Sequence, residues 1–248
     1  MNILVTGATS GFGAAIARRF IKEGHRVVAT GRRTERLATL AAECGERLHA
    51  LVLDVRDREA IAQAIASLPA DFAAIDVLVN NAGLALGLKP AHEADLADWE
   101  QMVDTNIKGL MYMTRAVTPG MVERGGGHVI NIGSVSGEWP YPGGNVYGGT
   151  KAFVRQFSLN LRADLVGRGV RVSNIEPGMA ETEFSLVRYS GDSEKAASIY
   201  AGTQPLSADD IADTAYWIAS RPAHININTI SLMPECQAFS AFTVKRRS

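Results

Sequence analysis

The chain has 248 residues, of which 46% are hydrophobic and 21% are charged, and its formal net charge is −1. These values are typical of a globular protein and differ from those of disordered or membrane-embedded chains. The balanced charge also gives no electrostatic reason to expect nucleic acid or an anionic membrane as a partner.

The two cysteines, Cys44 and Cys236, lie far apart in the sequence and have no spacing typical of a zinc site or a disulfide framework. Both are therefore predicted to be reduced, and no metal is expected. No apolar run approaches the length of a membrane span, and no basic leader precedes the first glycine turn. The expected location is the cytoplasm.

Seven short runs rich in β-branched residues alternate with segments of helical periodicity. Several runs are apolar without strict alternation, which is typical of strands in a parallel sheet covered by helices on both faces. No repeat or linker divides the chain. We predict a single-domain α/β protein over residues 1–248, with a doubly wound, seven-stranded parallel sheet. The runs are ILVTG (3–7), RVVAT (26–30), LHALVLD (48–54), IDVLVNNAG (75–83), GHVINIGS (127–134), VRVSNIEPG (170–178) and NTISLM (228–233).

The first strand and the helix after it enclose a glycine-rich turn. Gly7, Gly11 and Gly13 form a GxxxGxG pattern, in which the missing side chains let the backbone approach a pyrophosphate at the helix N-terminus. Its place at the first strand-to-helix junction favours a Rossmann-type dinucleotide site over a purely structural turn. The predicted cofactor contacts of this turn also include Thr9, Ser10 and Phe12.

The second strand ends in Gly31, Arg32 and Arg33, where an NAD-binding fold usually carries an acidic residue for the ribose 2′-hydroxyl. A carboxylate repels a 2′-phosphate, whereas guanidinium groups bind it bidentately, so Arg32 and Arg33 favour NADP over NAD. The alternative is that two solvated arginines simply open the next helix. Asp54, which ends the third strand, either caps its loop or accepts from the adenine amine, and Val55 is assigned to the same part of the cofactor.

A tyrosine and a lysine lie four positions apart in GGNVYGGTK, residues 143–151. On a helix this spacing places Tyr147 and Lys151 on one face, where the ammonium is expected to lower the pKa of the phenol from about 10. A phenol tuned in this way can protonate a carbonyl oxygen as hydride arrives, or take the proton back in oxidation. The alternatives are a core aromatic at Tyr147 and a surface position for Lys151.

The one long irregular region, residues 178–206, follows the sixth strand. An open α/β sheet places ligand contacts beyond the carboxyl ends of its strands, so this region is predicted to be a substrate loop or lid rather than a surface excursion.

Together these landmarks resemble the short-chain dehydrogenase/reductase family, over nearly the whole chain. The glycine turn, NNAG at 80–83, Asn106, INIGS ending at Ser134, and YxxxK follow one another in the order found in that family. The resemblance implies that Ser134 holds the substrate oxygen and that Tyr147 is the general acid/base. It also implies that Asn106 positions a water that relays protons from Lys151. The cofactor contacts it implies are Asn81, Gly83, Tyr147, Lys151, Pro177, Gly178 and Thr182, the last bonding the carboxamide or a phosphate.

Within the family, the sequence is most similar to NADP-dependent 3-hydroxy acid dehydrogenases, which act on serine, allo-threonine and related short acids. The similarity extends into the substrate loop, although PGMAETEF at 177–184 is one residue shorter than in some relatives. The predicted substrate contacts are Ser134, Tyr147 and Arg188, with the Arg188 guanidinium forked onto the carboxylate. Pairing of Arg188 with Glu183 or with another subunit is an equal alternative. Trp139 and Tyr141 either flank the pocket or only pack.

Two other functions are considered. A broader carbonyl or 3-oxoacyl reductase would need an open mouth at residues 179–206 and a basic surface to meet an acyl carrier. A non-catalytic NADP sensor would use the fold only for binding, and the presence of both Tyr147 and Lys151 disfavours it. The family resemblance also implies a homotetramer, in which the helices around 100–122 and 150–166 pair between subunits.

Overall fold

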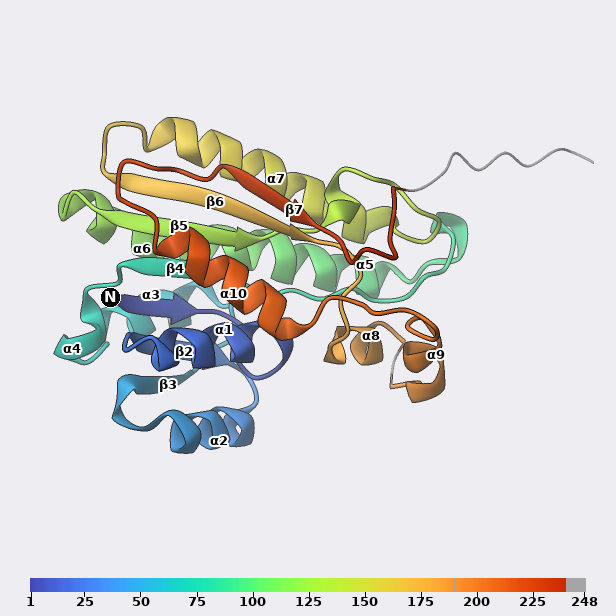
Figure 1. Cartoon of the computed structure of the whole chain (residues 1–248), viewed down its shortest axis with the longest axis horizontal. Helices are drawn as coiled ribbons and strands as arrows, with labels where there is room; N and C mark the ends of the chain where they lie inside the picture. Colours follow the sequence, from blue (N-terminus) through green and yellow to red (C-terminus); the bar gives the residue numbers. More distant parts are fainter. Residues whose placement is uncertain (190, 240–248) are drawn as a thin grey trace, which may run out of the picture.

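The computed structural model describes residues 1–189 and 191–239. Its centre is one parallel sheet of seven strands in the order β3-β2-β1-β4-β5-β6-β7 (Figure 1). All seven strand predictions are confirmed. The strands are β1 (Asn2–Val5), β2 (Arg26–Gly31), β3 (Leu48–Val52), β4 (Val77–Asn80), β5 (Gly127–Ile132), β6 (Val170–Pro177) and β7 (Thr229–Leu232).

Helices cover both faces of this sheet, as the apolar strand runs predict. The α-helices are α1 (Gly11–Lys22), α2 (Thr34–Cys44), α3 (Arg58–Ala66), α4 (Ala70–Ala73), α5 (Leu96–Val103), α6 (Leu110–Glu123), α7 (Asn145–Asp164), α8 (Glu183–Arg188), α9 (Ser193–Ser198) and α10 (Ala208–Ala219). Short helical turns are η1 (Gly45–Arg47), η2 (Ala91–Glu93), the π-helical η3 (Asp104–Gly109) and η4 (Val135–Gly137). Among the helices of the described residues, none has the length and apolar character needed to cross a membrane.

Two apolar layers hold the helices on the sheet. Ile3 and Val5 of β1 pack in the first layer with Phe20 of α1 and with the buried side of α10. Leu4 packs in the second layer, among residues of α3 and α6. Neighbouring residues of one strand thus point to opposite faces, and apolar side chains of the helices cover both faces. Figure 1 shows α1 and α10 side by side on one face of the sheet.

The strand order reverses between β1 and β4, which lie side by side at the centre of the sheet. In an open α/β sheet, the crevice at such a reversal, outside the carboxyl ends of the strands, is where ligands bind. Beyond the carboxyl end of β6, the segment 178–206 folds into α8 and α9 and returns to its start through a bridge between Ala180 and Leu206.

Candidate active site

A cavity of about 770 Å³ runs along the carboxyl ends of the strands. Its lining combines the turn after β1, the ends of β2 to β6, the start of α7 and the segment 178–206. Nearly all the predicted site residues therefore line this one cavity. Those that line it are Gly7, Thr9, Ser10, Gly11, Phe12, Arg32, Arg33, Asp54, Val55, Asn81, Gly83, Ser134, Tyr147, Lys151, Pro177, Gly178, Thr182 and Arg188.

Two predicted residues, Gly13 and Asn106, are absent from that lining and support it from behind. A Cβ on Gly13 would collide with the carbonyl oxygen of Gly7, so this glycine lets α1 start directly against the turn. A Cβ on Gly83, which does line the cavity, would lie 3.3 Å from Asn106 Oδ1. Asn106 is 2% exposed and sits one layer behind the cavity wall.

The glycine turn has the backbone that a pyrophosphate site requires. Gly7 and Gly11 have φ angles of +67° and +49°, in the left-handed region that side chains rarely adopt. A Cβ on Gly7 would also come within 2.9 Å of the Cα of Ala82. The turn leads directly into α1, whose first backbone N–H groups have no partners within the helix and favour an anion.

Arg33 crosses from the end of β2 to the glycine turn. Its Nε and Nη2 donate to Thr9 Oγ1 at 3.0 and 2.9 Å, and Nη2 also donates to Ser10 Oγ at 2.6 Å. Arg32 is more exposed, and its Nη1 lies 3.9 Å from Asp54 Oδ2. Two guanidinium groups and two hydroxyls thus meet where the adenosine ribose of a dinucleotide is expected, and this donor set fits a 2′-phosphate.

Asp54 has a clear partner within its own loop. Its Oδ1 accepts the backbone N–H of Arg56 at 3.0 Å, and its Oδ2 accepts from Arg56 Nη2 at 2.6 Å. The hydrogen bond from the Arg56 side chain is the main cause that lowers the pKa of this carboxyl. The structure therefore shows Asp54 capping its loop, which was one of the two alternatives for this residue.

The NNAG segment ties β4 to the glycine turn. Asn81 Nδ2 donates to the carbonyl oxygens of Thr6 and Gly7 at 2.8 and 3.2 Å. Asn80 points the other way, into the core, and donates to Thr114 and Asn131. Adjacent asparagines thus serve different layers, because successive strand residues face opposite sides.

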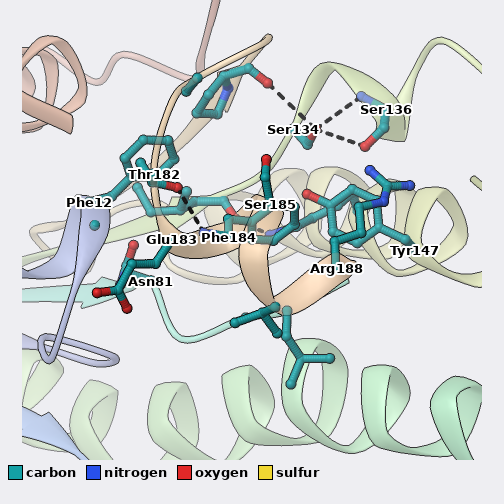
Figure 2. A pocket seen from close by; sticks show the side chains of 18 of the residues that line it. Phe12, Asn81, Ser134, Ser136, Tyr147, Thr182, Glu183, Phe184, Ser185 and Arg188 are labelled. Atoms are coloured by element: carbon teal, nitrogen blue, oxygen red, sulfur yellow. Dashed lines mark hydrogen bonds between the residues drawn. The ribbon is translucent and has the colours of Figure 1, made fainter. Parts of the chain in front are cut away.

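Ser134, Ser136 and Tyr147 form a cluster of hydroxyl groups at the end of β5 (Figure 2). Ser134 Oγ accepts from the backbone N–H of Ser136 at 3.2 Å and from Ser136 Oγ at 2.7 Å. Tyr147 is 8% exposed and lies in the first turns of α7. Its ring centroid is 5.6 Å from that of Phe184, which belongs to α8.

Lys151 lies one turn after Tyr147, on the same buried face of α7. Its Nζ donates to the carbonyl oxygen of Ile132 at 2.8 Å and lies 5.8 Å from the centroid of the Tyr147 ring. Asn106, in the π-helical η3, clamps Leu84 by accepting from its N–H at 2.9 Å and donating to its carbonyl oxygen at 2.8 Å. Its Nδ2 also donates to Thr150 Oγ1, so Asn106 joins the cavity wall to α7.

The pKa of Tyr147 differs from the expectation. Burial raises it to about 12, and the hydrogen bond from Ser134 is the largest effect in the opposite direction. Burial also lowers the pKa of Lys151 to about 8. The prediction that Lys151 lowers the pKa of the phenol is therefore wrong for this structure, because loss of solvation outweighs the nearby charges. At neutral pH Tyr147 is a neutral phenol that can donate a proton.

The segment 178–206 reaches across the cavity to the cofactor end. Thr182 caps α8, accepting the N–H of Phe184 at 3.2 Å, and its Cβ would lie 3.4 Å from a Cβ on Gly11. Glu183 pairs with Arg33 Nη1 at 3.0 Å and with Arg36 Nη1 at 2.6 Å. This pair of contacts joins α8 to the end of β2 and the start of α2.

Arg188 lies at the other end of α8, beside Tyr147 (Figure 2). Its Nη2 donates to the hydroxyl of Tyr141 at 2.6 Å, and its Cζ lies 5.6 Å from the centroid of the Tyr147 ring. Pairing with Glu183, one of the alternatives for Arg188, is wrong, because Glu183 is held by two other arginines at the opposite end of the helix. The Nε of Arg188 is buried and has no hydrogen-bond acceptor within residues 1–189 and 191–239.

Sequence reasoning missed three contributors to this site. Ser136 could have been found from the sequence, because it is a second serine two residues after Ser134. That spacing places its N–H and hydroxyl within reach of the Ser134 hydroxyl. Arg36 and Glu183 carried no local signal, since they lie 147 residues apart and meet only through the fold.

Comparison with known proteins adds four likenesses. The model of the short chain dehydrogenase family matches residues 1–191. The chain is 62% identical to an NADP-dependent 3-hydroxy acid dehydrogenase of Salmonella typhi, over 99% of this chain and all of that protein. It is 57% identical to a serine 3-dehydrogenase of Agrobacterium fabrum, over all of this chain and 99% of the relative. A serine dehydrogenase solved in its closed form with NADP+ superposes with a TM-score of 0.99 at 59% identity, and each chain covers the other completely.

Proposed function

Since the chain belongs to the short-chain dehydrogenase family, we propose that it transfers hydride between NADP(H) and carbon 3 of short 3-hydroxy acids such as serine or L-allo-threonine. The observation that carries this proposal is the enclosed Arg188 guanidinium beside Tyr147, with a buried Nε free to donate. A carboxylate is the group that such a donor set binds best. In the reductive direction the substrate is the matching semialdehyde.

The roles of the catalytic residues follow from their positions. NADPH supplies the hydride when it is bound, and the protein supplies binding, orientation and the proton. Tyr147, neutral at pH 7, is the donor of the proton to the carbonyl oxygen. Ser134 donates a hydrogen bond to the same oxygen and stabilises its developing charge. Lys151 and Asn106 complete the constellation, with Lys151 assigned to the nicotinamide ribose and Asn106 to the proton relay.

The cofactor is assigned to the wall formed by the glycine turn, Arg32, Arg33 and Asn81, with Pro177, Gly178 and Thr182 at the nicotinamide end. The left-handed Gly7 and Gly11 support a dinucleotide, and the arginine and hydroxyl cluster supports NADP rather than NAD. We regard residues 1–248 as one domain in which the segment 178–206 is the substrate loop. Contact of Phe184 with Tyr147 narrows the substrate end, which favours a small acid over a bulky acyl carrier.

The experiment is a kinetic comparison of substrates that differ in charge. Purified protein is assayed with NADP and with NAD on L-serine and L-allo-threonine, and with NADPH on uncharged aldehydes and diketones. We expect turnover of the 3-hydroxy acids with NADP, little with NAD and none in Tyr147→Phe. Turnover of uncharged carbonyl compounds alone would instead support the broader reductase, and tight NADPH binding without any turnover would support the sensor.

Arg188→Ala tests the carboxylate contact within the same assay. Because the guanidinium is proposed to bind only the charged group, KM for 3-hydroxy acids is expected to rise about tenfold or more, the loss of one charge-assisted bond. KM for an uncharged aldehyde is the internal control and should stay within about twofold. An unchanged KM for L-serine in this variant rules out the assignment of Arg188.

We also propose a homotetramer in the cytoplasm. Phe153 and Phe157 stack one turn apart on α7 and give this helix an apolar surface suited to a second subunit. Both Cys44 and Cys236 are free thiols, as a reducing compartment favours. Light scattering of the purified protein measures the mass of the assembly directly.

A further inference from the structure

The hydroxyl of Ser136 lies in the active site and has no role in the chemistry proposed above. A serine hydroxyl has one proton to donate and two lone pairs that accept. At Ser134 Oγ both lone pairs are filled, one by the N–H of Ser136 at 3.2 Å and the other by the Ser136 hydroxyl at 2.7 Å. The proton of Ser134 is therefore the only part of that group left to make a further bond.

Apart from the phenol oxygen of Tyr147, the acceptor that this proton meets among the described residues is a poor one. The carbonyl oxygen of Pro177 lies 3.5 Å from Ser134 Oγ, at the outer limit of a hydrogen bond. A substrate oxygen at normal distance is a better partner. The two bonds from Ser136 thus turn Ser134 into a donor that faces the cavity, which is the orientation that a developing oxyanion needs.

The position of Ser136 is fixed by the packing of η4 on α7. A Cβ on Gly137 would lie 2.7 Å from the carbonyl carbon of Lys151, so the turn can approach the helix only with glycine at that position. A Cβ on Gly148 would lie 3.0 Å from the carbonyl oxygen of Ser136. Glu138, which follows η4, is bound to Arg155 of α7 at 2.6 Å. The turn that carries Ser136 is therefore seated on the helix that carries Tyr147 and Lys151.

We propose that Ser136 is a positioning residue for the reaction: its hydroxyl orients Ser134 as a donor toward the substrate oxygen (Figure 2). This inference rests on the proposed function, since it concerns the same catalytic hydroxyls.

The test compares Ser136→Ala, Ser136→Thr and the wild type, each with and without Ser134→Ala. Removing the Ser136 hydroxyl should lower kcat about three- to tenfold, as expected for one hydrogen bond, with a smaller change in KM. Threonine keeps the hydroxyl and should restore kcat to within about twofold. In the Ser134→Ala background the Ser136 substitution should have almost no further effect, because its partner is already gone.

The split between kcat and KM supplies a readout that simple loosening of the turn would not give, because loosening would weaken substrate binding as well. Thermal unfolding of each variant checks that the fold is retained.

Equal losses of kcat with and without Ser134, or no restoration of kcat in Ser136→Thr, would overturn the proposal. The assays use whichever substrate the wild type turns over best. Failure of the proposed function appears as a wild type that reduces uncharged aldehydes and ignores 3-hydroxy acids. In that case the comparison of Ser136 variants is made on the aldehyde, so the two failures are distinguishable.

Discussion

At the scale of single residues, Lys151 shows the conflict between catalysis and stability. Its side chain is buried, and only the carbonyl oxygen of Ile132 is recorded as its hydrogen-bond partner in the described part of the chain. Burial lowers its pKa from 10.5 to about 8, so the charged form costs the folded state about 3 kcal/mol at pH 7. This cost is fully present below pH 8 and is relieved as the pH rises from 8 toward 10.5.

Lys151→Met is therefore expected to be inactive and yet more stable than the wild type. The methionine removes the desolvated charge and loses one hydrogen bond, which leaves a net gain of about 2 kcal/mol in the free energy of unfolding at pH 7. The gain should nearly vanish by about pH 9.5, because the remaining cost of burial, about 1 kcal/mol, is then offset by the lost hydrogen bond. Urea unfolding at both pH values measures it. A variant less stable than the wild type at pH 7 contradicts the assignment of a charged, desolvated lysine.

At the scale of elements, α8 connects the two ends of the cavity. Glu183 in its first turn forms ion pairs with Arg33 and Arg36. Arg188 in its last turn lies beside Tyr147. The ion pairs are partly exposed, so each contributes modestly and is weakened by salt. Their effect is expected in the rate at which the cofactor leaves rather than in the stability of the fold.

Glu183→Gln is predicted to speed NADPH dissociation about two- to fivefold at low salt, because the carboxylate no longer anchors α8 across the cleft. Stopped-flow fluorescence of bound NADPH, displaced by excess NADP, measures this rate. Glu181→Gln is the matched control, since Glu181 is exposed and, among the described residues, makes no side-chain ion pair. Slower dissociation in Glu183→Gln would mean that the carboxylate competes with the 2′-phosphate for Arg33.

At the scale of the whole molecule, the sheet contains a buried histidine that makes the free energy of unfolding depend on pH. His128 of β5 bonds Ser173 of β6 at 2.8 Å, and burial lowers its pKa to about 3. The unfolded chain takes up the proton near pH 6.5, whereas the folded chain does not. The stability contribution of neutral His128 is therefore complete above pH 6.5 and is lost as the pH falls from 6.5 toward 3.

His128→Gln should remove that part of the acid sensitivity. Between about pH 7.5 and pH 5 the wild type is expected to lose about 2 kcal/mol more of its free energy of unfolding than the variant, because glutamine has no proton to bind. Glutamine can still bond Ser173, so the two proteins differ mainly in titration. Urea unfolding at the two pH values gives the difference. Parallel losses in both proteins would exclude His128 as the source.

The sequence predicts the sheet well, and it predicts many of the residues that line the cavity, because these signals are local. Apolar runs mark all seven strands, and the glycine turn and YxxxK are short patterns. The direction of the Tyr147 pKa could not be predicted, since it depends on how much water the assembled fold removes from the phenol. The Glu183 pairs with Arg33 and Arg36 could not be predicted either, because they depend on how the segment 178–206 folds back over the cleft.

One short helix, α8, carries both Glu183, which binds Arg33 and Arg36, and Arg188, which lies beside Tyr147. This arrangement has a kinetic consequence. The dinucleotide can pass only if the Glu183 end of α8 moves away from Arg33 and Arg36. The same movement also carries Arg188 away from Tyr147. The proposed binding site for the acid is then complete only after the dinucleotide is in place, and it opens before the dinucleotide leaves. Catalysis should follow a compulsory order, with NADP(H) first on and last off. Product inhibition would accordingly be competitive between the two forms of the nucleotide and noncompetitive between the acid and its semialdehyde.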